Sequence, residues 1–192
     1  MKWTILIATA LAAAVVSVAA ATAGTTTHAK QPANKPTQAA IKKQLAKAKA
    51  ALSAYRSVDV AEAAGYKAES PCEWIPNAPQ ASWWGGGMGI HYVNDALLGK
   101  PINPSKPAIL TYVPAADGSM QLLAAEYFKP DADQNVRTDG DRPSVFGHPF
   151  DGPMLGHAPG MPIHYDLHVW LWKHNPSGMF APWNPDVTCP KS

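Results

Sequence analysis

The sequence predicts an α+β domain in which an N-terminal helical hairpin packs on a small antiparallel β-sheet or a partly open barrel. Apolar residues recur with a helical period only before Lys67, whereas the rest of the chain alternates short apolar runs with clusters of Pro and Gly. The 192 residues include 19 Pro and 14 Gly, which limits long helices. No helical spacer separates the apolar runs, and this favours antiparallel over parallel pairing.

The first 23 residues have the features of an export signal. Lys2 precedes an apolar, Ala-rich stretch, and Ala21-Thr22-Ala23 fits the small-x-small pattern of a cleavage site. We therefore expect a secreted or periplasmic protein whose mature chain begins at Gly24. Retention as a membrane anchor is the alternative, because the stretch approaches the roughly 20 residues that span a bilayer.

Residues 24–37 have the composition of a flexible linker, and residues 38–192 are expected to form a single domain. The apolar spacing predicts a helix over residues 37–56. One face of this helix carries the apolar residues Ile41, Leu45, Ala48, Leu52 and Tyr55. The lysines fall elsewhere, so this helix has a basic surface that is either simply solvated or makes weak contact with the cell envelope.

A second, short helix is predicted over residues 60–64. Asp59 and Glu62 have the spacing of a capping box, and Gly65 is expected to end the helix.

Four apolar runs predict strands, at residues 89–93, 108–113, 121–128 and 163–172. Residues 129–162 show no clear element and are expected to form a long loop. Loops of that length are usually functional or mobile.

The two cysteines, Cys72 and Cys189, are expected to form a disulfide, because an even pair in an exported protein is most often oxidised. This bond would join the start of the domain to its last residues. Neither cysteine has a nearby Cys or His at metal-ligand spacing, which argues against a thiolate metal site.

Charge is divided unevenly along the chain. Residues 24–67 carry eight basic and two acidic side chains, whereas residues 68–192 carry seven basic and twelve acidic ones. The body is therefore acidic, and the basic arm has no aromatic residue before Tyr55, so no nucleic-acid partner is expected. A metal ion or a small molecule is the expected partner.

Histidines concentrate in the acidic body, where six of the seven lie. If residues 163–172 form a strand, one face carries His164, Asp166, His168, Trp170 and Trp172, and the other face is apolar. Neighbours on such a face are about 6.6 Å apart, so Asp166 can share an ion with either histidine. The two histidines, about 13 Å apart, can share an ion only if the strand bends. On a helix they would chelate directly, which is the alternative.

Two further ionisable residues, His91 and Glu126, lie inside runs otherwise built for burial. Glu126 would share a strand face with Leu122, Ala124 and Phe128. Burying a carboxylate without a partner costs several kcal/mol, so Glu126 needs a cation, a donor or a metal. His91 and Glu126 could also satisfy each other or bond to the backbone.

Together these residues predict a site for one transition-metal ion, zinc, copper or iron, because neutral imidazoles with a carboxylate suit these metals. The candidate ligands are His91, Glu126, His164, Asp166 and His168. His148 and His157 in the long loop would cover this site, complete its ligands or remain solvated.

The leading hypothesis is a secreted metal-binding domain. Catalysis stays open, because an exposed ion with a water ligand could hydrolyse or oxidise a substrate, whereas a closed site would only hold the ion. The alternative is a metal-free binding module whose Trp-rich cleft takes a sugar or an aromatic ligand. That cleft would be lined by Trp74, Trp83, Trp84, Trp170, Trp172 and Trp183.

Several motifs resemble those of a group of secreted bacterial proteins of unassigned function. They are MGIHYVN at 88–94, EYF at 126–128, HPFDGPM at 148–154, GMPIHYDLHVWLW at 160–172 and NPSGMFAPWNP at 175–185. The resemblance extends from about Ala50 to Cys189. It implies export and a single domain, and it carries over no activity and no catalytic residue.

Overall fold

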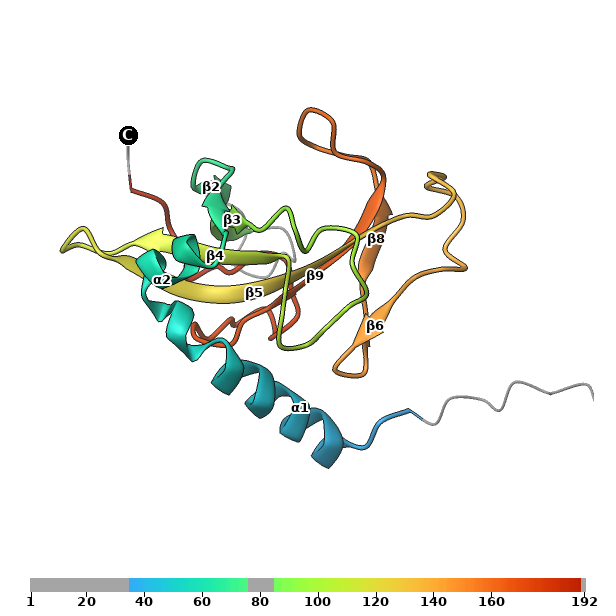
Figure 1. The fold of residues 1–192 in the computed structure, drawn as a ribbon, viewed down its shortest axis with the longest axis horizontal. Coiled ribbons are helices and arrows are strands. Elements are labelled where there is room, and N and C mark those ends of the chain that lie inside the picture. The colour runs from blue at the N-terminus through green and yellow to red at the C-terminus, as the bar shows by residue number, and fades with distance from the viewer. Residues whose placement is uncertain (1–34, 76–84, 191–192) are drawn as a thin grey trace, which may run out of the picture. The chain divides into compact units, whose positions relative to one another are not determined.

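The computed structural model describes residues 35–75 and 85–190. Within these residues, two short helices precede a seven-stranded antiparallel sheet that does not close into a barrel (Figure 1). The mixed fold class is confirmed, with the sheet as its larger part. The predicted signal peptide, the predicted linker up to Asn34 and the Trp83-Trp84 pair lie outside the described residues.

The helical region begins with α1 (Gln38–Ala51), where the Thr37 hydroxyl accepts a hydrogen bond of 3.2 Å from the Ala40 amide. A 3₁₀ helix (Ser53–Arg56) and α2 (Val58–Ala63) follow. The predicted apolar face is confirmed, because all its residues pack in the main core: Ile41, Leu45, Ala48, Leu52 and Tyr55. The lysines of α1 are exposed.

The capping box predicted for α2 is not formed. The helix is preceded by Ser57, which makes no side-chain capping bond, so Asp59 lies inside the first turn rather than at the cap. Its charge still favours that end of the helix, because backbone amides there are unpaired. Gly65 follows with a positive φ of 96°, and this left-handed residue ends the helix as predicted.

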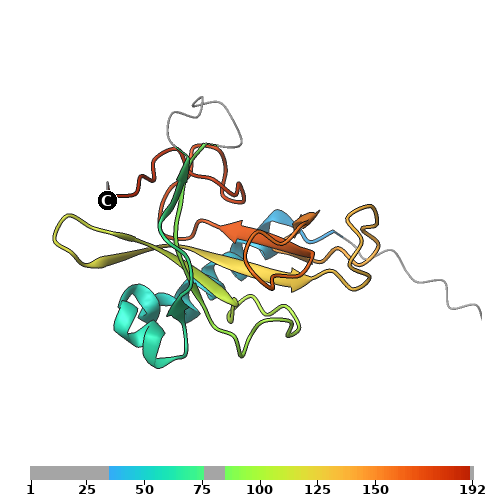
Figure 2. The ribbon, with the colours of Figure 1, turned by 90° about the horizontal axis from the view of Figure 1, so that it is seen from above.

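The strands of the main sheet are arranged in the order β1-β3-β4-β5-β9-β8, and β2 pairs with the free part of the β3 edge. Their bounds are β1 (Lys67–Ala68), β2 (Glu73–Ile75), β3 (Gly86–Val93), β4 (Ile109–Pro114), β5 (Met120–Pro130), β8 (Asp151–Met154) and β9 (His164–Val169). The four predicted strands correspond to β3, β4, β5 and β9. The longest, β5, crosses the sheet and forms an extended hairpin with β4 (Figure 2).

Residues 129–162, expected to form a loop, contain three short strands. β6 (Ser144–Val145) pairs with β7 (His148–Pro149), and β8 adds an edge strand beside β9. Strands of two to four residues are too short to show alternation, and β8 contains Gly and Pro, which strands usually avoid.

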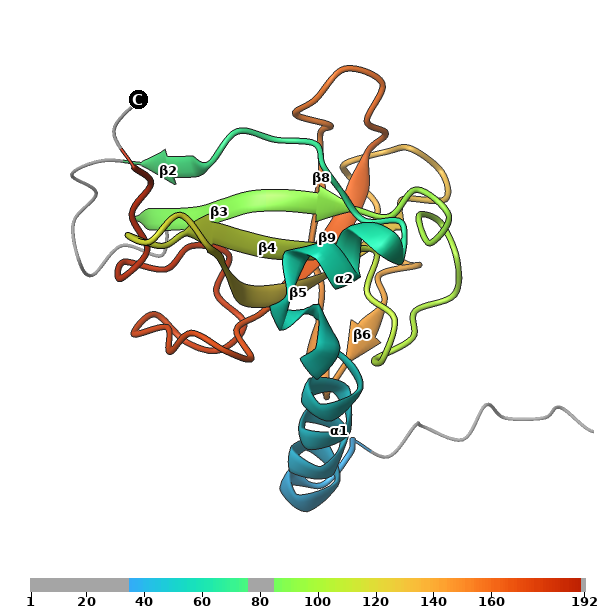
Figure 3. The same ribbon diagram turned by 60° about the vertical axis from the view of Figure 1, so that its left-hand side comes forward.

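The main core lies between the sheet and the helices, and Figure 3 shows α1 and α2 on one side of the sheet. Three buried tyrosines donate their hydroxyl protons to backbone carbonyls, two of them in the loop before β4 and one in the helical region. Tyr112 on β4 reaches Tyr55 in the helical region at 2.6 Å. The helices therefore fix the back of the sheet and leave its other face free for the site.

The two faces of β9 separate as predicted. Tyr165, Leu167 and Val169 are fully buried in the core, whereas the alternate residues line a cavity on the opposite face. Trp172 departs from the prediction because the strand ends at Val169, and its side chain packs against the main core instead.

A β-bulge in β5 makes one part of the predicted strand face wrong, because Leu122 does not share the face of Glu126. Thr111 pairs with Ala124 and Tyr112 with Leu122, so Leu123 is an extra residue between the two pairs. The alternation shifts at this point. Leu122 therefore packs in the main core, on the side away from Glu126.

The disulfide between Cys72 and Cys189 is confirmed, with a Cα–Cα distance of 5.7 Å. It ties the segment that leads into β2 to the C-terminal segment. Such a bond indicates an oxidising location outside the cytoplasm. None of the helices in the described part of the chain has the length and apolar character needed to cross a membrane.

Candidate metal centre

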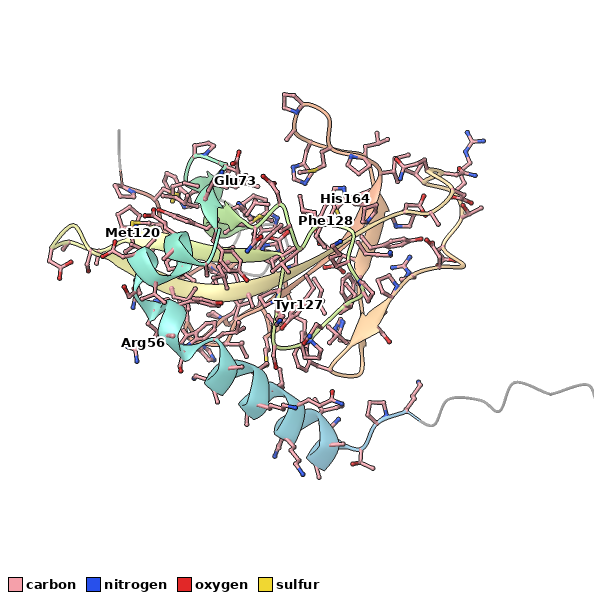
Figure 4. The ribbon with its side chains drawn as sticks, in the orientation of Figure 1. Arg56, Glu73, Met120, Tyr127, Phe128 and His164 are labelled. Atoms are coloured by element: carbon pink, nitrogen blue, oxygen red, sulfur yellow. A yellow bond between two sulfur atoms is a disulfide. The ribbon has the colours of Figure 1, made fainter. Side chains whose placement is uncertain are left out.

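A cavity of about 900 Å³ lies on the face of the sheet opposite to the helices. Figure 4 shows Glu73, Phe128 and His164, which line it, on one side of the sheet and the core residue Tyr127 on the other. The ionisable residues of its lining are Glu69, Glu73, His91, Glu126, Asp151, His157, His164, Asp166 and His168. The described lining includes no Lys or Arg, so the cavity favours cations.

His91, Glu126 and His168 meet at one point of this cavity. The Glu126 Oε2 atom lies 3.3 Å from His91 Nε2 and 3.4 Å from His168 Nε2. Two ligands bound to one tetrahedral zinc ion at about 2.0–2.1 Å are separated by about 3.4 Å. Both distances to the carboxylate oxygen therefore match the spacing that a single ion requires, and one ligand atom from each residue lies within 4.8 Å of the other two.

The sheet register explains why these residues meet. Glu126 on β5 and His168 on β9 are directly paired, so their side chains leave the same face of adjacent strands. His91 reaches them from β3 across the intervening strand β4. Its partner there is Thr111, a small, fully buried residue that leaves room for the contact.

The contacts of His91 suit one tautomer. The Ser70 hydroxyl lies 2.8 Å from the Pro71 carbonyl oxygen and 3.0 Å from His91 Nδ1. When this hydroxyl donates its single proton to Pro71, it accepts the proton that Nδ1 carries. The Nε2 atom then presents a lone pair to Glu126, which is the state that a metal ligand needs.

His168 and Glu126 are left without hydrogen-bond partners. His168 is 1% exposed and neither ring nitrogen has a partner, and Glu126 is 4% exposed with Oε2 unpartnered. Leaving a buried polar atom unpaired costs about 1–3 kcal/mol. Acceptor atoms that face one another at this distance need a shared cation or a proton between them.

Burial sets the charge state of these three residues. It lowers the pKa of His91 to about 3, with the neighbouring His168 adding to this effect, and it also lowers the pKa of His168. The pKa of Glu126 is raised well above its usual value, first by burial and then by Asp166 and Glu73. Burial therefore disfavours the charged forms of all three side chains, and a bound cation would offset that cost for the carboxylate.

The remaining predicted ligands belong to a second group in the same cavity. His164 and Asp166 lie with His157, and one ligand atom from each falls within 4.8 Å of the others. The five predicted residues thus do not gather around one point, because His164 and His168 are separated along β9. The sequence left the role of His157 open, since a histidine in a long loop shows no pattern.

The other described histidines lie outside the cavity lining. His148 on β7 packs against Phe180, with ring centres 4.5 Å apart, and His174 is exposed.

The described tryptophans do not gather in one cleft. Trp183 lines the cavity, whereas Trp170 is buried and its indole N–H donates to Ala181 at 2.7 Å. Trp172 packs on the core, and Trp74 is exposed. Trp170 also stacks beside His168, so its place is structural support for the histidine.

Comparison with known proteins gives no further guide. No model of a protein family matches the chain, and neither the curated proteins nor the solved structures include a match. The resemblance to secreted bacterial proteins therefore stays a prediction, and the functional argument depends on the geometry of the cavity.

Proposed function

We propose that this protein is an exported metal-binding protein that holds one transition-metal ion between His91, Glu126 and His168. One observation carries the proposal: two imidazole Nε2 atoms face the same carboxylate oxygen at 3.3 and 3.4 Å, inside a buried and otherwise unsatisfied site. Two histidines and a carboxylate form a ligand set typical of zinc, and copper and iron also accept these ligands.

The surroundings support a site that exchanges ligands. Three protein ligands leave a coordination position open, as in catalytic rather than structural zinc sites. That position would face the cavity, where a water molecule or a small substrate can bind. An ion held in this way would lower the pKa of a bound water and so supply a nucleophile for hydrolysis.

Support from outside the ligand set also favours a metal. Ser70 holds the His91 ring through Nδ1 and thereby directs Nε2 toward the centre, as partners of metal-bound histidines commonly do. The cavity contributes negative charge, and the disulfide is consistent with export to a compartment where the ion would be acquired.

The test is the metal content of the exported protein, purified without chelators or an affinity tag. We expect the wild type to retain zinc, copper or iron, and the His168→Ala variant to lose the ion of this centre. The matched control is His148→Ala, which removes a histidine outside the cavity. A wild-type protein that is empty, and whose thermal midpoint does not change on adding any of the three metals, would exclude the proposal.

A further inference from the structure

The second histidine group lies in the same cavity as the first centre. His164 is 1% exposed, and its Nε2 atom lies 3.7 Å from Asp166 Oδ2, which is too far for a hydrogen bond. Asp166 is 7% exposed. Both residues are therefore largely removed from bulk water, with donor atoms that face one another across a gap.

His164 is oriented as a ligand would be. Its Nδ1 atom lies 3.0 Å from the Pro162 carbonyl oxygen, which can only accept, so Nδ1 carries the proton and Nε2 has the lone pair. The ring also stacks on Phe128, with ring centres 4.7 Å apart. The lone pair of Nε2 thus has a fixed direction, toward Asp166.

Negative charge accumulates beside this pair. Asp151 on β8 is directly paired with Asp166 on β9, and like charges at paired positions destabilise a sheet. The Asp151 Oδ2 atom is buried and has no hydrogen-bond partner. Arg142 and His148 offset part of the charge of Asp151, and a cation bound beside Asp166 would offset more.

His157 approaches the pair from the loop that joins β8 to β9, the orange loop at the top of Figure 1. Its ring centre is 5.3 Å from that of His164. The base of the loop is closed, because a Cβ atom on Gly156 would lie 2.0 Å from the Met161 carbonyl oxygen. Only glycine fits this contact, and the contact holds His157 near the sheet.

We propose that a second divalent transition-metal ion binds between His157, His164 and Asp166, and that it ties the β8–β9 loop to the sheet. Asp151 contributes charge from the neighbouring strand. The cavity is then a two-cation site whose first ion is held only by the sheet and whose second ion also needs the loop. Because His157 is exposed, the second ion exchanges more readily than the first.

Calorimetric titration of the metal-free, full-length exported chain with zinc chloride tests this proposal. We expect two equivalents in the wild type and in His148→Ala. In His157→Ala and in the nearly isosteric Asp166→Asn, the second equivalent should weaken by about 10- to 100-fold or more, while the first is kept. In Glu126→Gln the second equivalent should persist while the first is lost.

Hydrogen exchange supplies an independent measurement. Exchange of the amides at residues 155–162 should slow when the second equivalent binds to the wild type, and it should not slow in His157→Ala. Because His157 is an exposed loop residue, this variant leaves the buried sheet intact, and circular dichroism checks the fold.

The outcomes separate the two proposals. A single equivalent in the wild type that is lost in His168→Ala and unaffected by His157→Ala would overturn the second site and leave the proposed function standing. Two equivalents that both survive His157→Ala and Asp166→Asn would also overturn it. A second equivalent that binds without the first, in Glu126→Gln, supports the second site even if the first centre proves wrong.

Discussion

Glu126 Oε2 and His168 Nε2 lie 3.4 Å apart from directly paired positions of β5 and β9, and no hydrogen bond joins them. Both side chains are almost completely buried. A pair of acceptors fixed in this way by the sheet register has room for a cation or a proton and little else.

Replacing Glu126 by Gln should abolish the stabilisation that metal at the first centre provides. The amide keeps the shape of the side chain but loses the anionic oxygen that the ion needs. Zinc at 100 times its Kd should stabilise the wild type by about 2.7 kcal/mol, visible as a higher thermal midpoint, and should leave the variant's first centre empty. The control is Glu69→Gln, an exposed carboxylate of the same cavity, which should respond like the wild type.

Ser70→Ala should weaken metal binding without changing any ligand. His91 would lose the acceptor for its Nδ1 proton and could adopt the other tautomer, whose Nε2 cannot bind a metal. We expect a loss of affinity of about 10- to 100-fold at the first centre, measured by competition with a zinc chelator. Ser53→Ala, at an exposed helical position, should have no effect, and equal affinities for Ser70→Ala and the wild type would disprove the role given to Ser70.

Asp151→Asn should stabilise the metal-free protein at neutral pH. Burial and the nearby Asp166 raise the pKa of Asp151 to about 6. The folded state therefore binds this proton more tightly than the unfolded chain does, so the stability that Asp151 contributes is fully present at low pH and is lost as the pH rises from about 4 through 6.

The Asp151→Asn variant has no carboxylate at this position, so it does not lose this stability as the pH rises. In the presence of a chelator it should exceed the wild type at pH 7 by about 1 kcal/mol, since Asp151 is only half-buried and solvent screens part of the effect. The difference should vanish near pH 4. Urea unfolding at the two pH values measures it, and a variant that is less stable at pH 7 would contradict the sign.

Loss of the disulfide should reduce both stability and metal affinity. Replacing Cys72 and Cys189 by Ser removes a cross-link between positions 117 residues apart, with a maximum cost of about 4–5 kcal/mol in the chain-entropy model. Cys72 is also close in sequence to Ser70, so the His91 support should loosen. Zinc affinity and the thermal midpoint are both measured. An unchanged zinc affinity would show that the disulfide does not support the metal centre.

Local patterns in the sequence were sufficient to predict α1, the four longer strands and the two faces of β9. Each of these features depends on apolar residues that recur with a period of two or about 3.6 residues, and this period can be seen directly in the sequence. The disulfide followed from an even number of cysteines in a chain with an export signal. His91 and Glu126 could be singled out because each stands among residues that are otherwise apolar.

The rest depends on contacts that a local pattern does not carry. The register that places Glu126 opposite His168, and the bulge at Leu123 that turns Leu122 away, are properties of strand pairing. Edge strands such as β8 are too short to show a period. His157 joins His164 only because the loop folds back, so the division into two groups could not be predicted.

The first centre is assembled from β3, β5 and β9, which are far apart in the sequence and are brought together only in the finished sheet. An unfolded chain thus offers no chelate of comparable strength. Folding must come before loading, and the protein would take its ion only where the sheet and the disulfide can both form. The identity of the bound metal would therefore depend on which ions are available where the protein folds, rather than on which ions are present where it is synthesised.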